Sequence, residues 1–415
     1  MVLSQRPNRE HAAELALAFV GLLWLTHGLD YVIYEIFPKI VVRSFALLLF
    51  AASAVILLIK RREHQDALIR SWPIWIAPLL ALLSLLWSDA PDLTLRRATA
   101  LLGSTCFGVF LITRFESEER IRLVAACIIV LAGLSVLRVI FVPGGGLSDA
   151  SGGAAWRGVF GHKNYLGRAM ALGALAFLIL AFRADRIRWS AVGLAVCVAI
   201  GLATRSASGI ISMLTPLAAA ATLRIIQRLP AEKRTRVLVI SALLGLVGTG
   251  VAVLFADEIL GPFGRDSTLT GRTFIWQASW RAILLRPWFG YGYGAVWYTD
   301  RPGISRQISH DVEFDPLTAH SGFFDLLLEL GALGLLAIAL PFALCAARSV
   351  AWVLKHDSPL RLWPLAYLVF YTVSNVAESE LLRQNSIFWV LFVATVIWVE
   401  TESAVPTSNP CQPSV

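Results

Sequence analysis

The chain has 415 residues, of which 57% are hydrophobic and only 15% charged, and its formal net charge is +8. Soluble domains are roughly 45–50% apolar and about 25% charged, so the composition excludes an ordinary soluble protein and indicates an integral membrane protein. The positive charge follows the loops of such a protein and calls for no nucleic-acid partner.

The apolar runs predict an all-α membrane protein with about twelve spans, counted against the roughly 17–25 residues that cross a bilayer. Residues 1–415 form a single polytopic domain. The first run lacks a small-residue cleavage site and is therefore predicted to be a span, not a removable signal peptide. The expected cores are 14–29, 40–59, 72–87, 95–113, 121–142, 164–182, 187–203, 206–223, 237–256, 322–346, 362–376 and 386–399.

Cations set the predicted orientation of these spans. With the N-terminus in the cytoplasm, more than half of the 36 Lys and Arg residues fall in cytoplasmic loops and tails, as the positive-inside rule expects. Both termini, including the tail 401–415, are then cytoplasmic. Several cations beside the outer ends of spans break the rule, and an anionic partner would explain them: Arg96, Arg97, Lys163, Arg168 and Arg205.

Residues 257–320 form the only large loop, placed in the periplasm between the ninth and tenth spans. Within it, Trp276, Trp280 and Ile283 recur at helical spacing from Arg272 to Leu285, which predicts an amphipathic helix lying in the headgroup zone or against the bundle. The following "GYGYG" lacks the ending of a phosphate-binding loop and is predicted to be a turn. The glycine-rich residues 143–156 are predicted to be a flexible outer linker.

Three residues at positions predicted to face outward are the main candidates for catalysis. Arg205 lies in a very short connection, Arg272 at the start of the loop helix, and His320 where the chain re-enters the membrane. Guanidinium groups match phosphate oxygens, and a neutral histidine can accept a proton from a hydroxyl. Each residue also has a structural interpretation, as an anchor, a helix-end contact or a cap, and spacing alone does not show that they converge. The candidate substrate-binding residues are His162, Lys163, Asn164, Arg168, Arg281 and Ser321.

The helix that follows His320 carries two acids inside an apolar run. Asp325 and Glu329 are four residues apart and share one helix face. We expect them to pair with cations such as Arg138 or Arg168; the alternative is that one acid orients His320. No CxxC, HExxH or EF-hand pattern occurs, so neither a metal nor another cofactor is predicted.

The stretch "HSGFFDLLLELGALG" fits the His-Ser-x9-Gly-x-x-Gly pattern of the O-antigen ligase and polymerase family, with Gly331 and Gly334 at the expected offsets. "RGVFGHKNYLG" and "GRTFIWQ…RPWFGYGYGAVW" also resemble that family, from about Trp87 to Trp398. "RPWFGYGYGAVW" and "ESELLRQN" look closer to its exopolysaccharide-polymerase branch.

The resemblance implies a bacterial inner-membrane glycosyltransferase with a C-type bundle. It would take a glycan from undecaprenyl diphosphate at the periplasmic face and pass it to a lipid-linked repeat, as a polymerase, or to lipid A-core, as a ligase. Polymerase is slightly preferred. Arg205 and Arg272 match the diphosphate-binding arginines and His320 the catalytic histidine; the expected reaction is inverting and metal-independent.

Other functions are compatible with the same features. A lipid-linked glycan transporter or flippase, a lipid diphosphate phosphatase and a non-catalytic partner of an export complex are the alternatives. Besides donor, acceptor and membrane lipids, a chain-length regulator or an export complex is a candidate partner.

Overall fold

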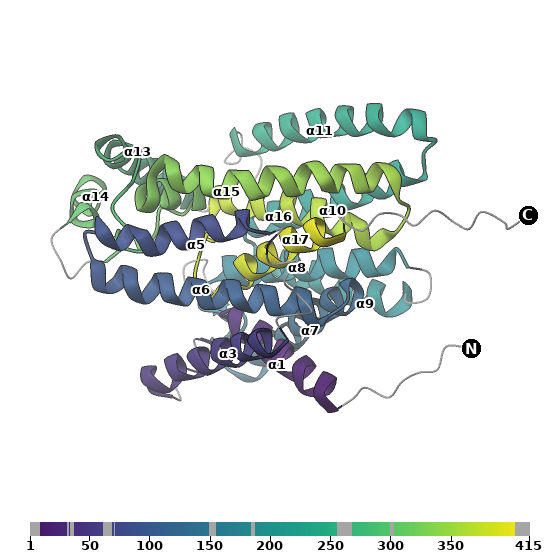
Figure 1. Cartoon of the computed structure of the whole chain (residues 1–415), viewed down its shortest axis with the longest axis horizontal. Helices are drawn as coiled ribbons and strands as arrows, with labels where there is room; N and C mark the ends of the chain where they lie inside the picture. Colours follow the sequence, from purple (N-terminus) through teal and green to yellow (C-terminus); the bar gives the residue numbers. More distant parts are fainter. Residues whose placement is uncertain are drawn as a thin grey trace, which may run out of the picture.

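A computed structural model gives the arrangement of the chain and describes residues 9–30, 33, 37–60, 69, 71–148, 155–183, 187–254, 268–298 and 303–402. These residues are mostly helical, and most of the helices run side by side along the long axis of the molecule (Figure 1). The helices are α1 (Arg9–Leu25), α3 (Lys39–Ile59), α5 (Pro73–Leu83), η1 (Ser84–Leu86), α6 (Pro91–Arg114), α7 (Ser117–Phe141), α8 (Lys163–Ala181), α9 (Ile187–Ala203), α10 (Ala207–Arg228), α11 (Ala231–Leu254), α13 (Thr268–Leu285), α14 (Ile304–Val312), α15 (Gly322–Lys355), η5 (Pro359–Leu362), α16 (Trp363–Ala377) and α17 (Ile387–Glu402).

Each predicted span core overlaps one of these helices, which confirms the helical, membrane-protein character of the chain. Within the described residues, 5 helices are long and apolar enough to cross a membrane, namely α6, α7, α8, α10 and α15. The total of about twelve crossings and their orientation stay predictions. The tail from residue 403 onward and residues 257–267 of the large loop lie outside the described residues.

The first helix ends earlier than its apolar run predicts. α1 stops at Leu25, because the Thr26 hydroxyl donates to the Leu23 carbonyl at 2.6 Å and accepts the Gly28 N–H at 3.1 Å. His27 then takes a left-handed φ of 56°. Side chain–backbone bonds of this kind compete with helix propagation. The turn places His27 at the end of the helix instead of within it.

The last helix forms the centre of the bundle. Every residue of α17 from Ile387 to Glu400 is buried, as expected of a helix that is apolar on all sides. It packs against α6, α15 and α16, between which it is drawn in Figure 1. Two large buried side chains of this core have hydrogen-bond partners: the Trp389 indole donates to Thr105 Oγ1 at 3.0 Å and the Tyr367 hydroxyl to the Phe388 carbonyl at 2.6 Å.

The large loop contributes two helices at one end of the bundle, on the left in Figure 1. A helix is present where the amphipathic helix is predicted; it is α13 and begins at Thr268, before Arg272, but Trp280 of the predicted apolar face is 50% exposed. Its side chains pack toward the bundle through Trp276, which stacks on Phe324 with ring centroids 5.7 Å apart. The second loop helix, α14, was not predicted.

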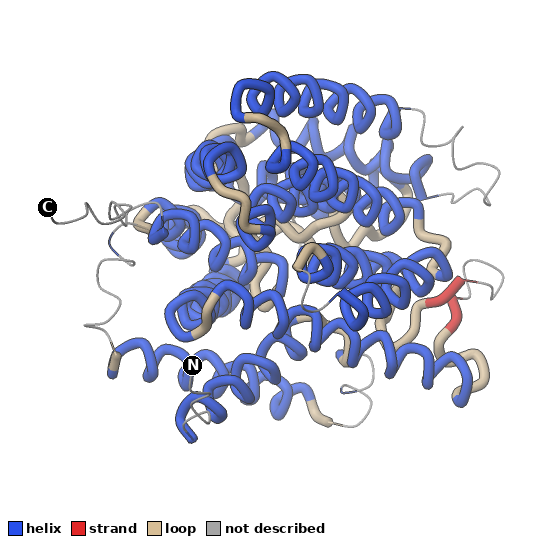
Figure 2. Tube along the Cα trace, turned by 90° about the vertical axis from the view of Figure 1, so that its right-hand side faces the viewer, coloured by secondary structure: helices blue, strands red, loops and turns tan. Residues whose placement is uncertain are grey.

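The glycine-rich segment after α7 is more ordered at its ends than a flexible linker. Leu147 pairs with Trp156 and Ser148 with Ala155 in an antiparallel ladder, coloured red in Figure 2. The Arg157 Nε donates to the Leu147 carbonyl at 2.8 Å and adds a side-chain tie. Residues 149–154 lie outside the described residues, so the linker prediction is corrected for the two ends of the segment only.

Helix α15 is interrupted where a turn of the large loop inserts. Gly331 has φ 62° and ψ −159°, a combination essentially confined to glycine. The interruption frees carbonyls of α15, and the N–H groups of Tyr291 and Gly292 donate to those of Leu328 and Glu329, both at 2.9 Å. Ala332 N–H in turn donates to the Pro287 carbonyl at 2.8 Å.

The "GYGYG" segment therefore forms a turn, as predicted, and it replaces part of the hydrogen-bond ladder of a helix. Gly290 has φ +63°, and a Cβ there would lie 2.5 Å from the Leu328 carbonyl oxygen. The Tyr293 hydroxyl donates to the Leu382 carbonyl at 2.7 Å. The turn thereby joins α15 to the connection between α16 and α17, where the candidate site lies.

Candidate functional site

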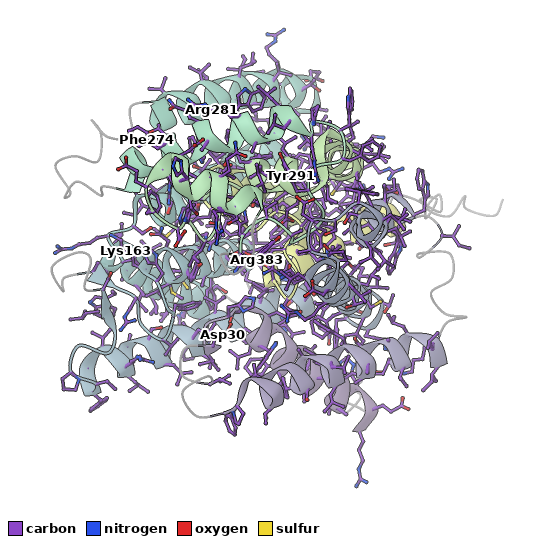
Figure 3. All side chains as sticks on the ribbon, turned by 90° about the vertical axis from the view of Figure 1, so that its left-hand side faces the viewer. Asp30, Lys163, Phe274, Arg281, Tyr291 and Arg383 are labelled. Carbon is purple, nitrogen blue, oxygen red and sulfur yellow. The ribbon has the colours of Figure 1, made fainter. Side chains whose placement is uncertain are left out.

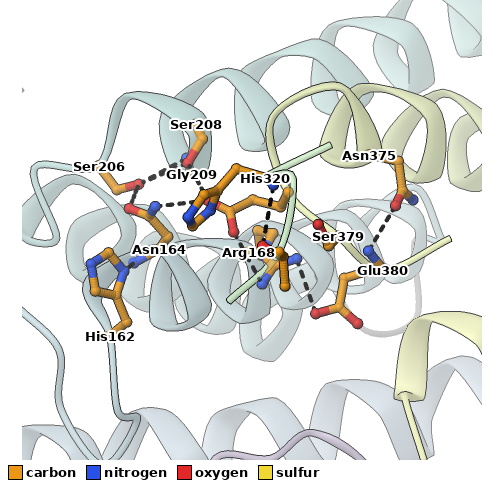
Figure 4. Close-up of polar contacts among 12 residues, drawn as sticks. His162, Asn164, Arg168, Ser206, Ser208, Gly209, His320, Asn375, Ser379 and Glu380 are labelled. Carbon is orange, nitrogen blue, oxygen red and sulfur yellow. Dashed lines mark hydrogen bonds and ion pairs between the residues drawn. The ribbon is translucent and has the colours of Figure 1, made fainter. Parts of the chain in front are cut away.

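Polar side chains from five separate parts of the chain meet at the α13–α14 end of the bundle (Figure 4). They come from the start of α8, the α9–α10 turn, α13, the segment before α15 and the α16–α17 connection. The surrounding helix ends are apolar, so the charges in this cluster are removed from solvent and depend on one another.

Glu378 is the centre of the cluster. Its Oε1 accepts hydrogen bonds from Asn164 Nδ2 at 2.7 Å and from Arg272 Nη2 at 3.2 Å. Ser206 Oγ donates to Asn164 Oδ1 at 2.8 Å and accepts the Gly209 N–H at 3.1 Å, so the residue that caps α10 also holds the amide. One carboxylate thus fixes the starts of α8, α10 and α13 relative to one another.

Arg168 lies behind this carboxylate and is almost fully buried, with 1% of its surface exposed. It pairs with Glu380 at 3.2 Å and approaches Glu378 at 3.8 Å. Its guanidinium also lies over the Tyr165 ring, 5.1 Å from the centroid, a favourable cation–π arrangement. Burial raises the pKa of Glu380, but the charges of Arg383 and Arg168 outweigh it and hold this pKa below its usual value.

His320 has a left-handed backbone, with φ 51°, and its side chain is half-buried. The chain before it is fixed on both sides, because the Trp276 indole donates to the Ala319 carbonyl at 2.9 Å and the His320 N–H to Thr318 Oγ1 at 3.1 Å. Burial lowers the pKa of His320; Glu378 opposes this shift and Arg272 adds to it. The imidazole is therefore neutral near pH 7 and able to accept a proton.

Asp325 of α15 does not form the predicted pair with Arg138 or Arg168. Asp325 Oδ1 accepts the Ala319 N–H at 2.9 Å and the Trp297 indole N–H at 2.7 Å. Arg168 is taken by Glu378 and Glu380, and Arg138 donates to the Gly145 carbonyl at 2.8 Å. The alternative prediction is nearer to the structure, since Asp325 fixes the residue before His320, although it contacts the backbone and not the imidazole.

Ser321 occupies the N-cap position of α15 without a side-chain cap bond. Its hydroxyl donates instead to the Asn375 carbonyl at 3.4 Å, while the Gly322 N–H donates to the Glu378 carbonyl at 2.9 Å. A Cβ on Gly322 would lie 2.3 Å from Asn375 Oδ1, so glycine is required for this close approach. The His-Ser-Gly sequence therefore docks directly on the α16–α17 connection.

The structure gathers most of the predicted site residues. Arg272, Arg168 and Asn164 contact Glu378, and the charges acting on His320 are those of Glu378, Arg272, His162 and Arg168. His162 caps α8 by accepting the Asn164 N–H at 3.2 Å, and the neighbouring Lys163 is buried.

Two predicted residues lie apart from this contact network. Arg205 is exposed, with φ 48°, in the α9–α10 turn immediately before Ser206. Arg281 is exposed and pairs with Asp311 of α14 at 3.7 Å. Seen from the α13–α14 end in Figure 3, Arg281 and Lys163 are well separated. Nine residues along a helix give about 13.5 Å of rise and about half a turn of rotation, so Arg281 cannot share the orientation of Arg272.

Sequence reasoning gave no role to the acids that organise the site. Glu378, Glu380 and Arg383 belong to "ESELLRQN", a charged run between the last two apolar runs. Arg383 Nη1 lies 3.3 Å from Glu380 Oε1, and Ser386 Oγ donates to Glu380 Oε2 at 2.8 Å. Two acids and an arginine in such a short, otherwise apolar region were the available signal.

Comparison with known proteins shows which family part of this chain resembles. Residues 192–339 match the model of the family described as O-antigen ligase. The predicted family resemblance is confirmed. The matched segment includes Arg205, Arg272 and His320, but not Arg168 or Glu378.

A curated relative gives a second match, which is longer than that segment. The chain is 28% identical over 283 residues to the "Exopolysaccharide production protein ExoQ" of Rhizobium meliloti (strain 1021), covering 64% of this chain and 63% of the relative. Less than two thirds of the relative's length is therefore spanned. Together the matches show that the chain is similar to proteins of the O-antigen ligase family and to a protein of exopolysaccharide production.

Proposed function

We propose that the protein is a glycosyltransferase of the bacterial inner membrane that takes a glycan from undecaprenyl diphosphate and transfers it to a sugar hydroxyl at the periplasmic face. The family matches support the reaction class. Support for the side comes from the positive-inside distribution of cations, which favours a periplasmic location for the end of the bundle that carries α13 and α14.

The observation that carries the proposal is the gathering of buried guanidinium groups beside a neutral imidazole. Arg272 is 5% exposed, and its Nε has no hydrogen-bond partner among the described residues. A buried donor without a partner is costly, and an anionic ligand oxygen would satisfy it. Guanidinium groups placed where negative charge develops stabilise a departing diphosphate, and the effect is large at a site with little water.

The reaction follows from these positions as a single displacement. The acceptor hydroxyl gives its proton to His320 while its oxygen forms a bond to the anomeric carbon of the donor. The bond from that carbon to the diphosphate oxygen breaks, and the electron pair leaves with undecaprenyl diphosphate. Arg272 stabilises the negative charge that develops on the departing diphosphate. Arg205, in the α9–α10 turn, adds to this stabilisation once the ligand is bound. Attack opposite to the leaving group inverts the anomeric centre.

Polymerisation is the preferred form of this reaction, with a lipid-linked repeat as the acceptor. The relative named for exopolysaccharide production supports it, as does "ESELLRQN", which supplies the acids of the site. A ligase would use lipid A-core as the acceptor. A chain-length regulator or an export complex is the partner expected of a polymerase.

Reconstitution of the purified full-length protein tests the proposal. A lipid-linked repeat should be converted to longer lipid-linked glycans with release of undecaprenyl diphosphate, without nucleotide or added metal. Deletion of the gene should leave single repeats on lipid if the enzyme is a polymerase and long, unattached chains if it is a ligase. Translocated lipid, or free phosphate without elongated glycan, would instead indicate a flippase or a phosphatase.

A further inference from the structure

A cavity lies beside Arg168 and Glu380, and neither Glu378 nor His320 is among the residues that line it. It has a volume of about 30 Å³ and lies between the end of α1, helices α7 and α8, and the start of α17. Its polar lining consists of Thr26, His27, Tyr165, Arg168, Glu380, Arg383 and Ser386. The remaining lining residues are apolar, among them Leu25, Ile128 and Phe388, so the polar groups occupy only part of the wall.

His27 is held in one tautomer at the edge of the cavity. Its Nδ1 lies 2.6 Å from Asp30 Oδ2. A carboxylate can only accept, so the proton of this bond is on Nδ1, and in the neutral imidazole Nε2 is an acceptor. His27 Nε2 is buried and has no hydrogen-bond partner among the described residues. Asp30 and Arg383 are both visible from the α13–α14 end in Figure 3.

Arg168 supplies the complementary donor. It is 1% exposed, and its Nε, like His27 Nε2, finds no hydrogen-bond partner in the described part of the chain. The cavity thus offers an acceptor on one wall and a donor on another, with the Glu380 carboxylate between two arginines. Only a group that both donates and accepts a hydrogen bond can pair with His27 Nε2 and Arg168 Nε at the same time. A hydroxyl does this, whereas a fully ionised phosphate has no proton to donate to Nε2.

We propose that this cavity is a subsite for one hydroxyl-bearing edge of the sugar in a lipid-linked glycan, with His27 as its hydrogen-bond acceptor and Arg168 as its donor. The inference rests on the proposed function. A single buried water needs about 10–15 Å³, so a cavity of about 30 Å³ admits a hydroxyl or hydroxymethyl arm and not a whole ring. The Tyr165 ring also lines the cavity and offers an apolar surface for the rest of the sugar.

The test measures binding with turnover stopped, using the full-length protein carrying His320→Ala. The two probes are the lipid-linked repeat extracted from a strain in which this gene is deleted, and farnesyl diphosphate, which has the diphosphate and prenyl chain but no sugar. Asp30→Asn inverts the favoured tautomer of His27, because an amide can donate to Nδ1. His27→Asn removes the imidazole while keeping a residue that tolerates a left-handed φ.

Each variant should weaken binding of the lipid-linked repeat by about three- to tenfold, the usual worth of one neutral hydrogen bond, and leave binding of farnesyl diphosphate unchanged. His310→Asn is the matched control, since this histidine is 90% exposed on α14, and it should leave both affinities unchanged.

Two results would overturn the inference. If neither affinity changes, the cavity holds only water. If both probes weaken equally, the pair acts on the diphosphate or on the fold. Failure of the proposed function is distinct: the parent protein with His27 and Asp30 intact would then not bind the lipid-linked repeat, and both proposals would fall.

Discussion

Removing the charge of Glu378 is the sharpest test of how the cluster is held together. In Glu378→Gln, the shape and one acceptor oxygen are kept, but Arg272 at 3.2 Å and Arg168 at 3.8 Å lose their shared anionic partner. The Glu378 and Arg168 side chains are 5% and 1% exposed, so water cannot replace the carboxylate. Removing one partner of a buried ion pair lowers the free energy of unfolding by about 3–5 kcal/mol. Because glutamine keeps one acceptor oxygen, the loss expected for Glu378→Gln is near the lower limit.

The assay is reversible unfolding of the purified protein in mixed micelles, which gives the free energy of unfolding. Asp357→Asn is the matched control, because it removes a carboxylate from Arg234 at 3.1 Å where Asp357 is 75% exposed. An exposed pair contributes about 0–1 kcal/mol. Equal losses for Glu378→Gln and Asp357→Asn would refute the reasoning that Glu378 organises the site.

The other predictions concern the arginine fork, the imidazole and the interrupted helix. Arg272→Lys should reduce transfer by at least tenfold without unfolding the protein, because an ammonium cannot reproduce a planar pair of donors; normal kinetics for this variant in the reconstituted assay would contradict it. Burial lowers the pKa of His320 from 6.5, so the neutral, base-competent form is present above that pKa and is lost as the pH falls through it. Transfer should therefore be flat from about pH 7 to 8 and decline only below about pH 6.5, and a decline that begins above pH 7 would exclude this base. Gly331→Ala should lower the free energy of unfolding by at least about 1–3 kcal/mol, because the added Cβ would lie 2.4 Å from the Trp288 carbonyl carbon. Gly245→Ala is the control: open space surrounds Gly245, so this variant should lose no stability.

The helices and the reactive residues could be predicted because local sequence determines them. Each apolar run is long enough to form a helix. A cation within an apolar run is costly in lipid, so it can be expected to have a partner. Arg272 and His320 were found in this way, and the structure brings the charge of Arg272 to act on His320.

The partners of those residues could not be predicted, because they depend on contacts between distant segments. Arg272 and Glu378 are separated by 106 positions, and no local pattern relates them. Asp325 was expected to pair with a guanidinium, yet it binds the Ala319 N–H and the Trp297 indole, since the loop supplies donors closer than any arginine. Likewise, Gly331 could be recognised as part of a motif. The interruption of α15 at Gly331 could not be predicted, because it depends on the turn of the large loop that inserts there.

Single-turnover transfer by His320→Ala, measured beside its affinity for the lipid-linked donor, tests the central claim most directly. General-base assistance is typically worth roughly 10²–10⁴ in rate, so the chemical step should slow by that factor while donor affinity stays at the wild-type value. Transfer at the wild-type rate by the His320→Ala protein would contradict the claim that this imidazole, set among the buried arginines, removes the proton from the acceptor.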